Sequence, residues 1–423
     1  MLGKGAILRN LLFVVVLLVL SAPVRAEDRW GPNRIPNPGL EQGDISWYSR
    51  MGAQKMDAED HVYADVTLDE SVAHTGKSSI RFTAAGNTTW WWGIESVPVP
   101  ARPGLRYKMV GWIKTEGVAV AEGQYDNCNL YIQFRDADDQ VVYVDDSPVR
   151  ATRALFGTND WTEVERIVRA PDGAVKVVLG CTMTCTGKAW FDDLELREAA
   201  PFDWTELETA RFIYHFPSGA SPPTAEVINQ NDRWLSQLEG VFEVKLDGRI
   251  DFYKYNDAEQ KGEMTGSAHL GHMEGSREIH SILWQDRHDM VHVLMNQVSQ
   301  SNLFLTEGLA TYWDGTLVGK DPRQAVKFNV QHGAIVPLEK LLNSRLFSRM
   351  PPHVGHQLAG SFVGYLIEAY SLNMFMDLYR KVTPEMPGLE LQAKIREVFG
   401  VEFSDVEAAW KNWVLSLEGP ATP

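Results

Sequence analysis

The sequence predicts two domains of different fold class, an all-β sandwich followed by an α+β domain. Residues 33–198 consist of short alternating apolar runs separated by turn residues, whereas apolar positions after residue 205 recur at helical spacing. The 423-residue chain has 44% hydrophobic and 23% charged residues, which is typical of globular proteins with packed cores. The pattern changes at Ala199-Ala200-Pro201, so we expect the domain boundary near residues 199–205.

Residues 1–26 have the pattern of a secretory signal peptide. Lys4 and Arg9 precede an apolar run over residues 11–20, and the segment ends in the small-residue sequence Val24-Arg25-Ala26. A membrane anchor is the alternative, but the run is shorter than the roughly 20 residues that span a bilayer. We therefore expect a secreted or periplasmic protein without a membrane span once the signal is removed.

Charge and cysteine content exclude several classes of function. The chain carries 40 Lys and Arg against 56 Asp and Glu, a formal charge of −16, and such a chain repels the phosphates of nucleic acids and anionic membranes. Three cysteines without a CxxC pair argue against a structural zinc ribbon. An oxidising compartment permits disulfides among Cys128, Cys181 and Cys185, and the sequence leaves their pairing open.

The first domain, predicted over residues 27–200, contains seven runs rich in Val, Ile, Tyr and Trp. Gly, Pro, Asn and Asp fill the gaps between these runs, a pattern typical of a β-sandwich. The predicted strands cover residues 79–83, 94–99, 107–114, 130–135, 161–168, 175–179 and 189–196.

The second domain, predicted over residues 205–415, mixes helices with isolated strands. The predicted helices cover residues 224–242, 284–298, 303–313, 360–370 and 389–399, and the predicted strands cover 210–215, 250–255 and 279–283. Residues 416–423 end in Gly-Pro-Ala-Thr-Pro and are expected to be a disordered tail.

Histidines in the second domain suggest a metal site. His288 and His292 are four residues apart in a helical pattern, so both rings lie on one helix face, about one turn apart. Glu307 follows at the start of another apolar helix. Two His and one Glu make up a ligand set of hydrolytic zinc sites, which leave one position open.

These two segments resemble the gluzincin metallopeptidases, in particular the peptidase MA-like group. The active helix of that group reads His-Glu-x-x-His, and its next helix carries Glu-Gly-Leu-Ala, matched here by Glu307-Gly308-Leu309-Ala310. The resemblance extends over about residues 208–415 and implies a zincin-like fold in which His288, His292 and Glu307 bind Zn²⁺. In that group an edge strand, here 279–283, pairs with an extended substrate.

One position departs from the gluzincin pattern, because Asp289 stands where the family has its catalytic Glu. Asp is one methylene shorter, and a displacement of about 1 Å can cost about a hundredfold in rate. We expect Asp289 to act as general base, and we nominate Tyr365 as the oxyanion donor, with Tyr312, His353 and His356 as alternatives. Thr311 is a candidate partner for a zinc-binding histidine.

The first domain resembles the CenC-like, galactose-binding-like carbohydrate-binding jelly rolls. The resemblance rests on Asn37-Pro38-Gly39-Leu40-Glu41, on His74-Thr75-Gly76-Lys77-Ser78-Ser79, on Pro103-Gly104-Leu105-Arg106-Tyr107 and on Trp190-Phe191-Asp192-Asp193-Leu194. It implies a structural Ca²⁺ bound by Glu41 and Asp192.

Tryptophan residues are the candidates for sugar contact in this domain. Trp90, Trp91 and Trp92 are consecutive, so at least one of them is expected to be exposed. We expect Trp112, Trp161 and Trp190, which lie in strand patterns, in the core.

Together these features predict a secreted zinc metallopeptidase, endopeptidase or aminopeptidase-like, that cleaves a protein or peptide and is targeted by a carbohydrate-binding module. The alternative is a non-catalytic exported pseudo-peptidase that binds a glycan or glycoprotein.

Overall fold

The computed structural model describes residues 29–49, 64–85, 93–120, 127–144, 147–315 and 322–417. The predicted signal peptide, the three tryptophans at 90–92 and residues 418–423 of the predicted tail lie outside these ranges. The chain forms two compact units that divide at Pro201/Phe202, and the short segments Gln140–Arg150 and Arg166–Pro171 group with the second unit.

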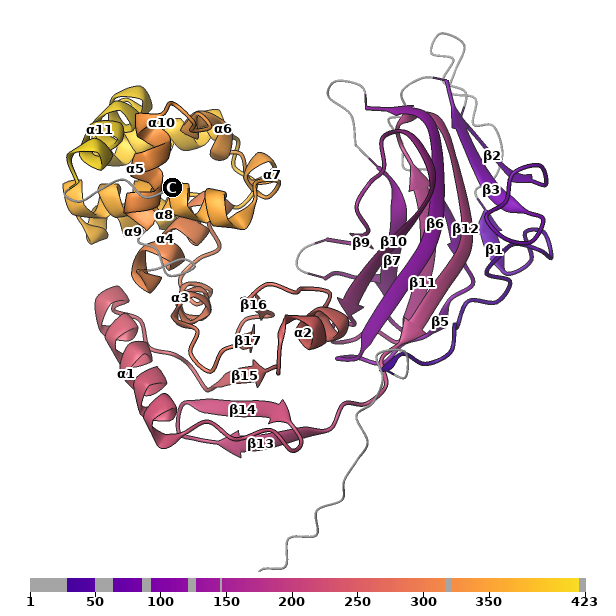
Figure 1. The fold of residues 1–423 in the computed structure, drawn as a ribbon, viewed down its shortest axis with the longest axis horizontal. Helices are drawn as coiled ribbons and strands as arrows, with labels where there is room; N and C mark the ends of the chain where they lie inside the picture. The colour runs from indigo at the N-terminus through magenta and orange to yellow at the C-terminus, as the bar shows by residue number, and fades with distance from the viewer. Residues whose placement is uncertain are drawn as a thin grey trace, which may run out of the picture. The chain divides into compact units, whose positions relative to one another are not determined.

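The first unit is a β-sandwich, as the alternating pattern predicts (Figure 1). One sheet has the order β1-β4-β11-β7-β8, with β5 beside β11 and β9 beside β7, and the other has the order β10-β6-β12-β3-β2. Its strands are β1 (Trp47–Ser49), β2 (Ala64–Asp69), β3 (Ser79–Ala84), β4 (Gly93–Ser96), β5 (Val99–Pro100), β6 (Arg106–Ala119), β7 (Cys128–Arg135), β8 (Val141–Val142), β9 (Arg150–Ala151), β10 (Gly157–Arg169), β11 (Lys176–Met183) and β12 (Thr186–Glu198).

Alternation of side chains builds the sandwich core. In β3 the residues Ile80, Phe82 and Ala84 are buried and those between them are less so, and in β12 the ring of Phe191 meets Phe82 at 5.1 Å. Cys128, Cys181 and Cys185 are buried, and none of the permitted disulfides is formed among them.

The second unit contains a five-stranded mixed sheet and eleven helices among its described residues. Its strands are β13 (Trp204–Glu208), β14 (Phe212–Pro217), β15 (Ile250–Lys254), β16 (Gly271–Glu274) and β17 (Glu278–Ser281), in the order β13-β14-β15-β17-β16. Its helices are α1 (Ala225–Phe242), α2 (Ala258–Thr265), α3 (Arg287–Met295), α4 (Leu303–Asp314), α5 (Pro322–Gln331), α6 (Leu338–Leu341), α7 (Ser344–Phe347), α8 (Pro352–Ala369), α9 (Leu372–Lys381), α10 (Gly388–Phe399) and α11 (Phe403–Ser416).

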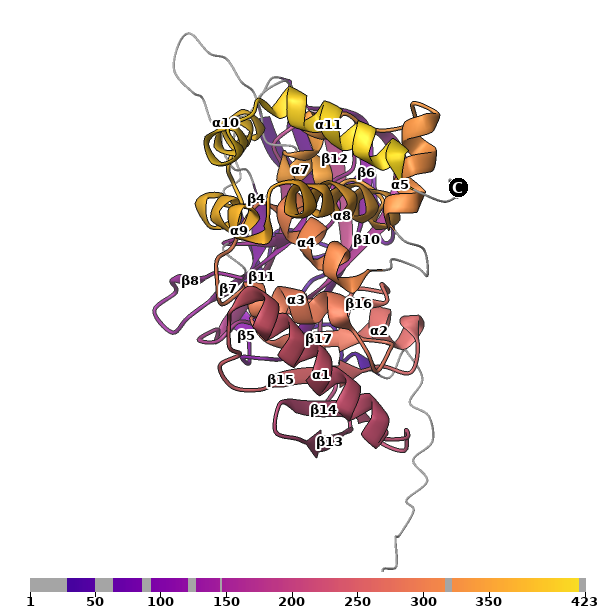
Figure 2. The same cartoon turned by 90° about the vertical axis from the view of Figure 1, so that its left-hand side faces the viewer.

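Helix α3 lies between the sheet and the group of helices α4 to α11, as Figures 1 and 2 both show. One face of the sheet is apolar, with Tyr214, Phe252 and Ile279 buried in the same core as Met290 and Leu294 of α3. Among the described residues, no helix has the length and apolarity needed to cross a membrane.

One sequence prediction about this sheet is wrong. Residues 279–283 were expected to form the edge strand, but β17 pairs with β15 on one side and with β16 on the other. The edge strand next to β17 is β16, whose four residues contain only one large apolar side chain, Met273, and therefore give almost no strand signal in the sequence.

Candidate metal centre

Helix α3 places two imidazole rings side by side. Asp286 caps its N-terminus by accepting a hydrogen bond from the Asp289 N–H at 3.1 Å, which fixes where the helical repeat begins. His288 and His292 then project from the same face, with their Nε2 atoms 3.1 Å apart. The apolar residues Met290, Val291, Val293, Leu294 and Met295 are buried in the core and hold the helix in place.

Helix α4 brings a carboxylate to these two rings. Its N-terminus is capped by Asn302, whose side chain accepts a hydrogen bond from the Phe304 N–H at 3.0 Å. Glu307 Oε2 lies 3.2 Å from His288 Nε2 and 3.4 Å from His292 Nε2. The three predicted ligands thus converge, although α3 and α4 are separate helices.

Close packing of α4 on α8 adds a third imidazole. Gly308 permits this packing, because a Cβ at that position would lie 2.7 Å from the carbonyl oxygen of Ala359 and 2.6 Å from Val363 Cγ2. His356, in the first turns of α8, consequently places its Nδ1 atom 3.5 Å from Glu307 Oε2.

The donor atoms fit a zinc ion. Zinc binds imidazole nitrogen and carboxylate oxygen at about 2.0–2.2 Å, so the donors of a tetrahedral site are about 3.3 Å apart. The separations among His288, His292 and Glu307 are 3.1, 3.2 and 3.4 Å. Two nitrogen donors and one oxygen donor at these spacings match the ligand set of a hydrolytic zinc site.

Asp289 lies beside this ligand set with one oxygen unused. A carboxylate oxygen of Asp289 lies within 4.8 Å of ring nitrogens of both His288 and His292. The residue is only 4% exposed, and within the described part of the chain its Oδ2 atom has no hydrogen-bond partner. Buried carboxylate oxygens are normally hydrogen-bonded, so this one is consistent with a site that receives a ligand.

The edge strand approaches the same carboxylate. A Cβ at Gly271, the first residue of β16, would lie 2.0 Å from Asp286 Oδ2 and 2.7 Å from Asp289 Oδ2. Glycine therefore lets β16 run close to the start of α3. This arrangement places an edge strand next to the candidate general base.

The charges of the centre are strongly coupled. Burial lowers the pKa of His288, but the hydrogen bond and negative charge of Glu307 outweigh it and raise that pKa to about 9. Burial raises the pKa of Glu307, yet His292 and His288 hold it well below its usual value. Burial and the neighbouring Asp286 carboxylate raise the pKa of Asp289 well above the ordinary range.

The structure does not bring Tyr365 to this cluster. Tyr365 follows His356 by nine residues on α8. Nine residues correspond to about two and a half helical turns, so the two side chains lie on opposite faces of the helix. The Tyr365 ring packs 5.7 Å from Trp413 and 6.3 Å from Tyr370. Of the four nominated oxyanion donors, His356 is the one that the structure places against the ligand set, with its Nδ1 atom 3.5 Å from Glu307 Oε2.

The other nominated residues of the second unit lie farther out. Tyr312 packs against the position of Gly364, and its pKa is raised by burial and by Glu368. His353 is exposed. Thr311 is buried, and its hydroxyl oxygen has no hydrogen-bond partner among the described residues, so its predicted bond to a zinc-binding histidine is not formed here.

Two residues at the centre were not found by sequence reasoning. Asp286 was missed, although an Asp directly before a helical pattern is a cap signal that could have identified it. Tyr379 comes from α9, where its buried hydroxyl lies 3.4 Å from Thr306 Oγ1. Burial and the negative charge of Glu307 raise its pKa to about 12, against the opposing effect of the Thr306 hydrogen bond. No local pattern marks that residue.

The predicted calcium ligands bind backbone amides. Glu41 Oε1 accepts hydrogen bonds from the N–H groups of Lys77 and Ser78, and Asp192 Oδ2 accepts from those of His74 and Thr75. Burial raises the pKa of Asp192 to about 6, against the opposing effect of these amides. Both carboxylates hold the loop at 74–78, and a calcium site there stays a prediction.

Comparisons with known proteins give matches among solved structures alone. No protein family model matches the sequence, and no curated protein matches it. Bacteriophage CBA120 tailspike protein 4, in its enzymatically active domain, is 15% identical with a TM-score of 0.29, over 39% of this chain and 21% of that one. The chain thus spans about a fifth of that domain.

Two of the other similar structures are carbohydrate-binding modules. A family 16 carbohydrate-binding module-2 is 20% identical over 39% of this chain and 99% of that chain, with a TM-score of 0.26. The CBM22-1 xylan-binding domain from Paenibacillus barcinonensis Xyn10C is 16% identical over 37% and 94%, with a TM-score of 0.23. TM-scores this low support no conclusion about function. The β-sandwich is therefore assigned from the strand order of its two sheets.

Proposed function

We propose that the second unit is a zinc-dependent peptidase. The observation that carries this proposal is the convergence of His288, His292 and Glu307 at the donor separations of a tetrahedral zinc site, with the Asp289 carboxylate beside them. A bound zinc ion supplies Lewis-acid activation of water and of a peptide carbonyl.

The residues of the chain then have separate tasks. With a zinc ion beside it to offset the burial and the Asp286 charge that raise its pKa, Asp289 would remove a proton from the attacking water through Oδ2 and return it to the leaving amine. His356 donates a hydrogen bond to the carbonyl oxygen as negative charge develops on it, since its ring lies next to Glu307. His356 replaces Tyr365 in this role.

The exposed side of β16 offers a place for the substrate backbone. Within the described part of the chain, strand β16 pairs with β17 alone, and it lies at the end of the sheet order. An extended peptide added as a further strand would run past Gly271 and so past Asp289. Backbone pairing of this kind selects for an extended peptide with little dependence on its side chains.

Substitutions of Asp289 test the peptidase proposal. We expect Asp289→Asn to retain zinc and to lose at least about a hundredfold in casein hydrolysis, because the base is removed and the ligands are kept. Asp289→Glu should remain active, and Asp405→Asn, on the exposed first turn of α11, is the matched control. Equal activity of the Asn variant and the wild type would refute the role of Asp289.

A wild-type protein that holds stoichiometric zinc and is inert on casein and on a broad peptide library would favour the alternative, a non-catalytic binding protein. In that case the same ligands would hold zinc for recognition or stability. Absence of zinc from all forms would instead refute the metal centre itself.

A second candidate function is carbohydrate binding by the sandwich. Two tryptophans expected in the core are only half-buried, Trp112 on β6 and Trp161 on β10, whereas Trp190 is 5% exposed. The His74 ring stacks on Trp112 at 4.0 Å and lies 5.5 Å from Trp161. Half-exposed aromatic rings are the surfaces on which sugar rings stack in proteins, and this grouping supports the proposal.

Affinity electrophoresis of the full chain in gels containing soluble polysaccharides tests this second function. Retardation that is lost in Trp161→Ala and kept in Tyr143→Ala would support it, because Tyr143 is an exposed aromatic residue outside the first unit. Equal migration of wild type and Trp161→Ala with every polysaccharide would leave the sandwich without a glycan role at this surface.

We also propose that the protein is exported from the cytoplasm. The basic start, the apolar run and the small-residue end of residues 1–26 favour passage to an extracytoplasmic compartment, where a peptidase meets surface proteins. N-terminal sequencing of the mature protein after expression with the full chain would show whether cleavage follows Ala26.

A further inference from the structure

A second cluster of histidine and carboxylate side chains lies on the strand hairpin β16–β17. In the antiparallel register His272 is opposite His280 and Glu274 is opposite Glu278. Residues two apart on a strand face the same side, so all four side chains project from one face of the hairpin. This face is opposite to the one on which Ile279 enters the core.

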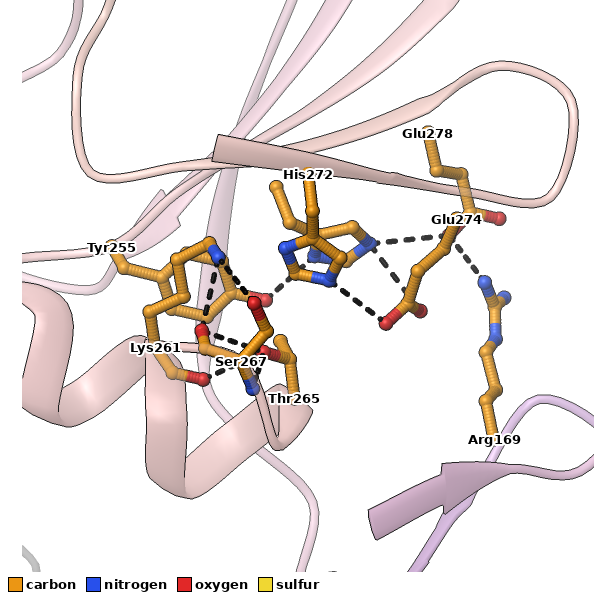
Figure 3. A network of polar contacts seen from close by, with 9 residues as sticks. Arg169, Tyr255, Lys261, Thr265, Ser267, His272, Glu274 and Glu278 are labelled. Atoms are coloured by element: carbon orange, nitrogen blue, oxygen red, sulfur yellow. Dashed lines mark hydrogen bonds and ion pairs between the residues drawn. The ribbon is translucent and has the colours of Figure 1, made fainter. Parts of the chain in front are cut away.

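The donor atoms of this cluster converge. His280 Nε2 lies 3.6 Å from Glu274 Oε2 and 3.6 Å from Glu278 Oε2. His272 Nε2 lies 3.2 Å from Glu274 Oε1, and Figure 3 shows these two side chains meeting. The ligand atoms of Glu274, Glu278 and His280 all lie within 4.8 Å of one another.

A contact with Tyr255 on the side of the ring away from the carboxylates fixes the orientation of His280. Tyr255 OH lies 2.8 Å from His280 Nδ1, so the other ring nitrogen is directed at the two carboxylates. The ring also stacks on Tyr253 at 4.6 Å and on His272 at 5.2 Å. Metal-binding histidines are commonly held in this way, with the second nitrogen bonded to a fixed partner that sets the tautomer.

The net charge of the cluster is negative and favours the binding of a cation. Two carboxylates and two imidazoles meet there, and Glu278 also forms an ion pair with Arg169, which groups with the same compact unit (Figure 3). With neutral imidazoles the four hairpin residues carry two negative charges against one positive charge. The net charge of −1 attracts a cation, and a divalent ion would leave the site with a net charge of +1.

We propose that His272, Glu274, Glu278 and His280 form a second metal site, selective for a first-row divalent ion such as Zn²⁺. The donors are two imidazole nitrogens and two carboxylates, which suit zinc and its neighbours better than calcium or magnesium. The ion would join β16 to β17 and so stiffen the edge strand. This site is separate from the helical ligand set and does not depend on peptidase activity.

Zinc stoichiometry of the full chain tests the proposal. We expect two equivalents of Zn²⁺ in the wild type after dialysis against buffered zinc, and one equivalent in Glu274→Gln, which keeps the side-chain shape. Glu259→Gln, an exposed glutamate in the first turn of α2, is the matched control and should keep two. His288→Ala should also keep one, because it removes only the helical site.

The combined His288→Ala, Glu274→Gln protein should bind no zinc. If Glu274→Gln and His280→Gln both bind as much zinc as the wild type, the hairpin site is refuted, whatever happens at His288. If His288→Ala binds as much zinc as the wild type and Glu274→Gln binds less, the helical site is refuted and the hairpin site is supported.

A structural measurement guards against a variant that fails to fold. In His288→Ala, addition of Zn²⁺ should slow amide hydrogen exchange in residues 271–281, and Tyr255→Phe should weaken this zinc binding by about 10–100-fold because His280 loses its fixed partner. Exchange in residues 271–281 that is unchanged by zinc would overturn the proposal.

Discussion

Two buried carboxylates, Asp69 in the first compact unit and Asp289 in the second, have opposite environments. In the sandwich, Asp69 accepts hydrogen bonds from the Ser71 hydroxyl at 2.6 Å and from the Trp190 indole at 2.9 Å, and it pairs with Arg81 at 3.0 Å. In the second unit, Asp289 Oδ2 has no hydrogen-bond partner among the described residues, and Glu307 lies between imidazoles. A satisfied carboxylate ties strands together, whereas one held in place without a partner is available to a ligand.

The largest expected effect comes from removing the shared carboxylate of the second unit. Glu307→Ala should lose the zinc of the helical centre, and peptide hydrolysis should fall to the level of a blank, because one of three ligands is gone. Zinc analysis and a casein assay on the same preparation measure both.

Asp69→Ala is the counterpart in the sandwich and should leave zinc content unchanged. If Glu307→Ala keeps both its zinc and its activity, Glu307 is not a metal ligand, and the contrast between Glu307 and Asp69 fails.

Removing the imidazole next to Glu307 should have the next largest effect. His356→Ala should lower kcat about 10²–10³-fold and leave zinc content unchanged, since loss of one oxyanion donor costs that much. Tyr365→Phe, on the opposite face of α8, should keep kcat within about twofold. Steady-state kinetics on a fluorogenic peptide distinguish them, and a larger loss in Tyr365→Phe would restore the original assignment.

Packing that assembles the centre can be disturbed without touching a ligand. Gly308→Ala places a methyl group against Val363 and the Ala359 carbonyl and should lower the free energy of unfolding by about 1–3 kcal/mol. Gly240→Ala, in α1 with open space around its Cα, should instead be neutral or stabilising by up to about 1 kcal/mol. Urea denaturation gives both values, and equal effects would argue against the close approach of α4 to α8.

The smallest expected effect tests the satisfied carboxylate of the sandwich. Burial alone would raise the pKa of Asp69, but hydrogen bonds from Ser71 and Trp190 and the Arg81 charge hold it well below the usual range. A lowered pKa in the folded state contributes stability above about pH 4, and this stability is lost as the pH falls further.

Asp69→Asn should therefore cost about 1–2 kcal/mol near pH 7, and the difference from the wild type should shrink in acid. Thermal unfolding at pH 7 and pH 3 measures this. Asp289→Asn is the matched change in the second unit and should not destabilise the metal-free protein, because burial and the Asp286 carboxylate already disfavour the charged form of this side chain. Equal destabilisation by both variants would remove the distinction between the two carboxylates.

Much of the fold followed from periodicity. The expected helices at 224–242, 303–313 and 389–399 agree closely with α1, α4 and α10, because each has a long apolar stripe. Helix α8 begins at Pro352, eight residues before the predicted start, since its first turns contain His353, Gly355 and His356 and show little apolar pattern. Short elements such as β16 and α7 carry too few apolar residues to be detected.

The sequence predicted those residues of the candidate site that lie close together along the chain. His288 and His292 lie one turn apart on a single helix, and Glu307 was named from the resemblance. His356 could be offered only as one of four choices, because its place depends on how α8 packs against Gly308. The hairpin cluster was not predicted because it depends on the register between β16 and β17, and the sequence of β16 gives almost no strand signal.

The three thiols of the chain offer a reporter for one unit alone. All cysteines of the sequence lie in the sandwich, each is buried, and burial raises the pKa values of Cys128 and Cys181 well above the ordinary range. Thiol reagents should therefore stay unreactive until the sandwich opens, while unfolding of the zinc-binding unit goes unlabelled. Pulsed alkylation followed by mass spectrometry would time the opening of the first unit within the intact protein, without introducing a probe.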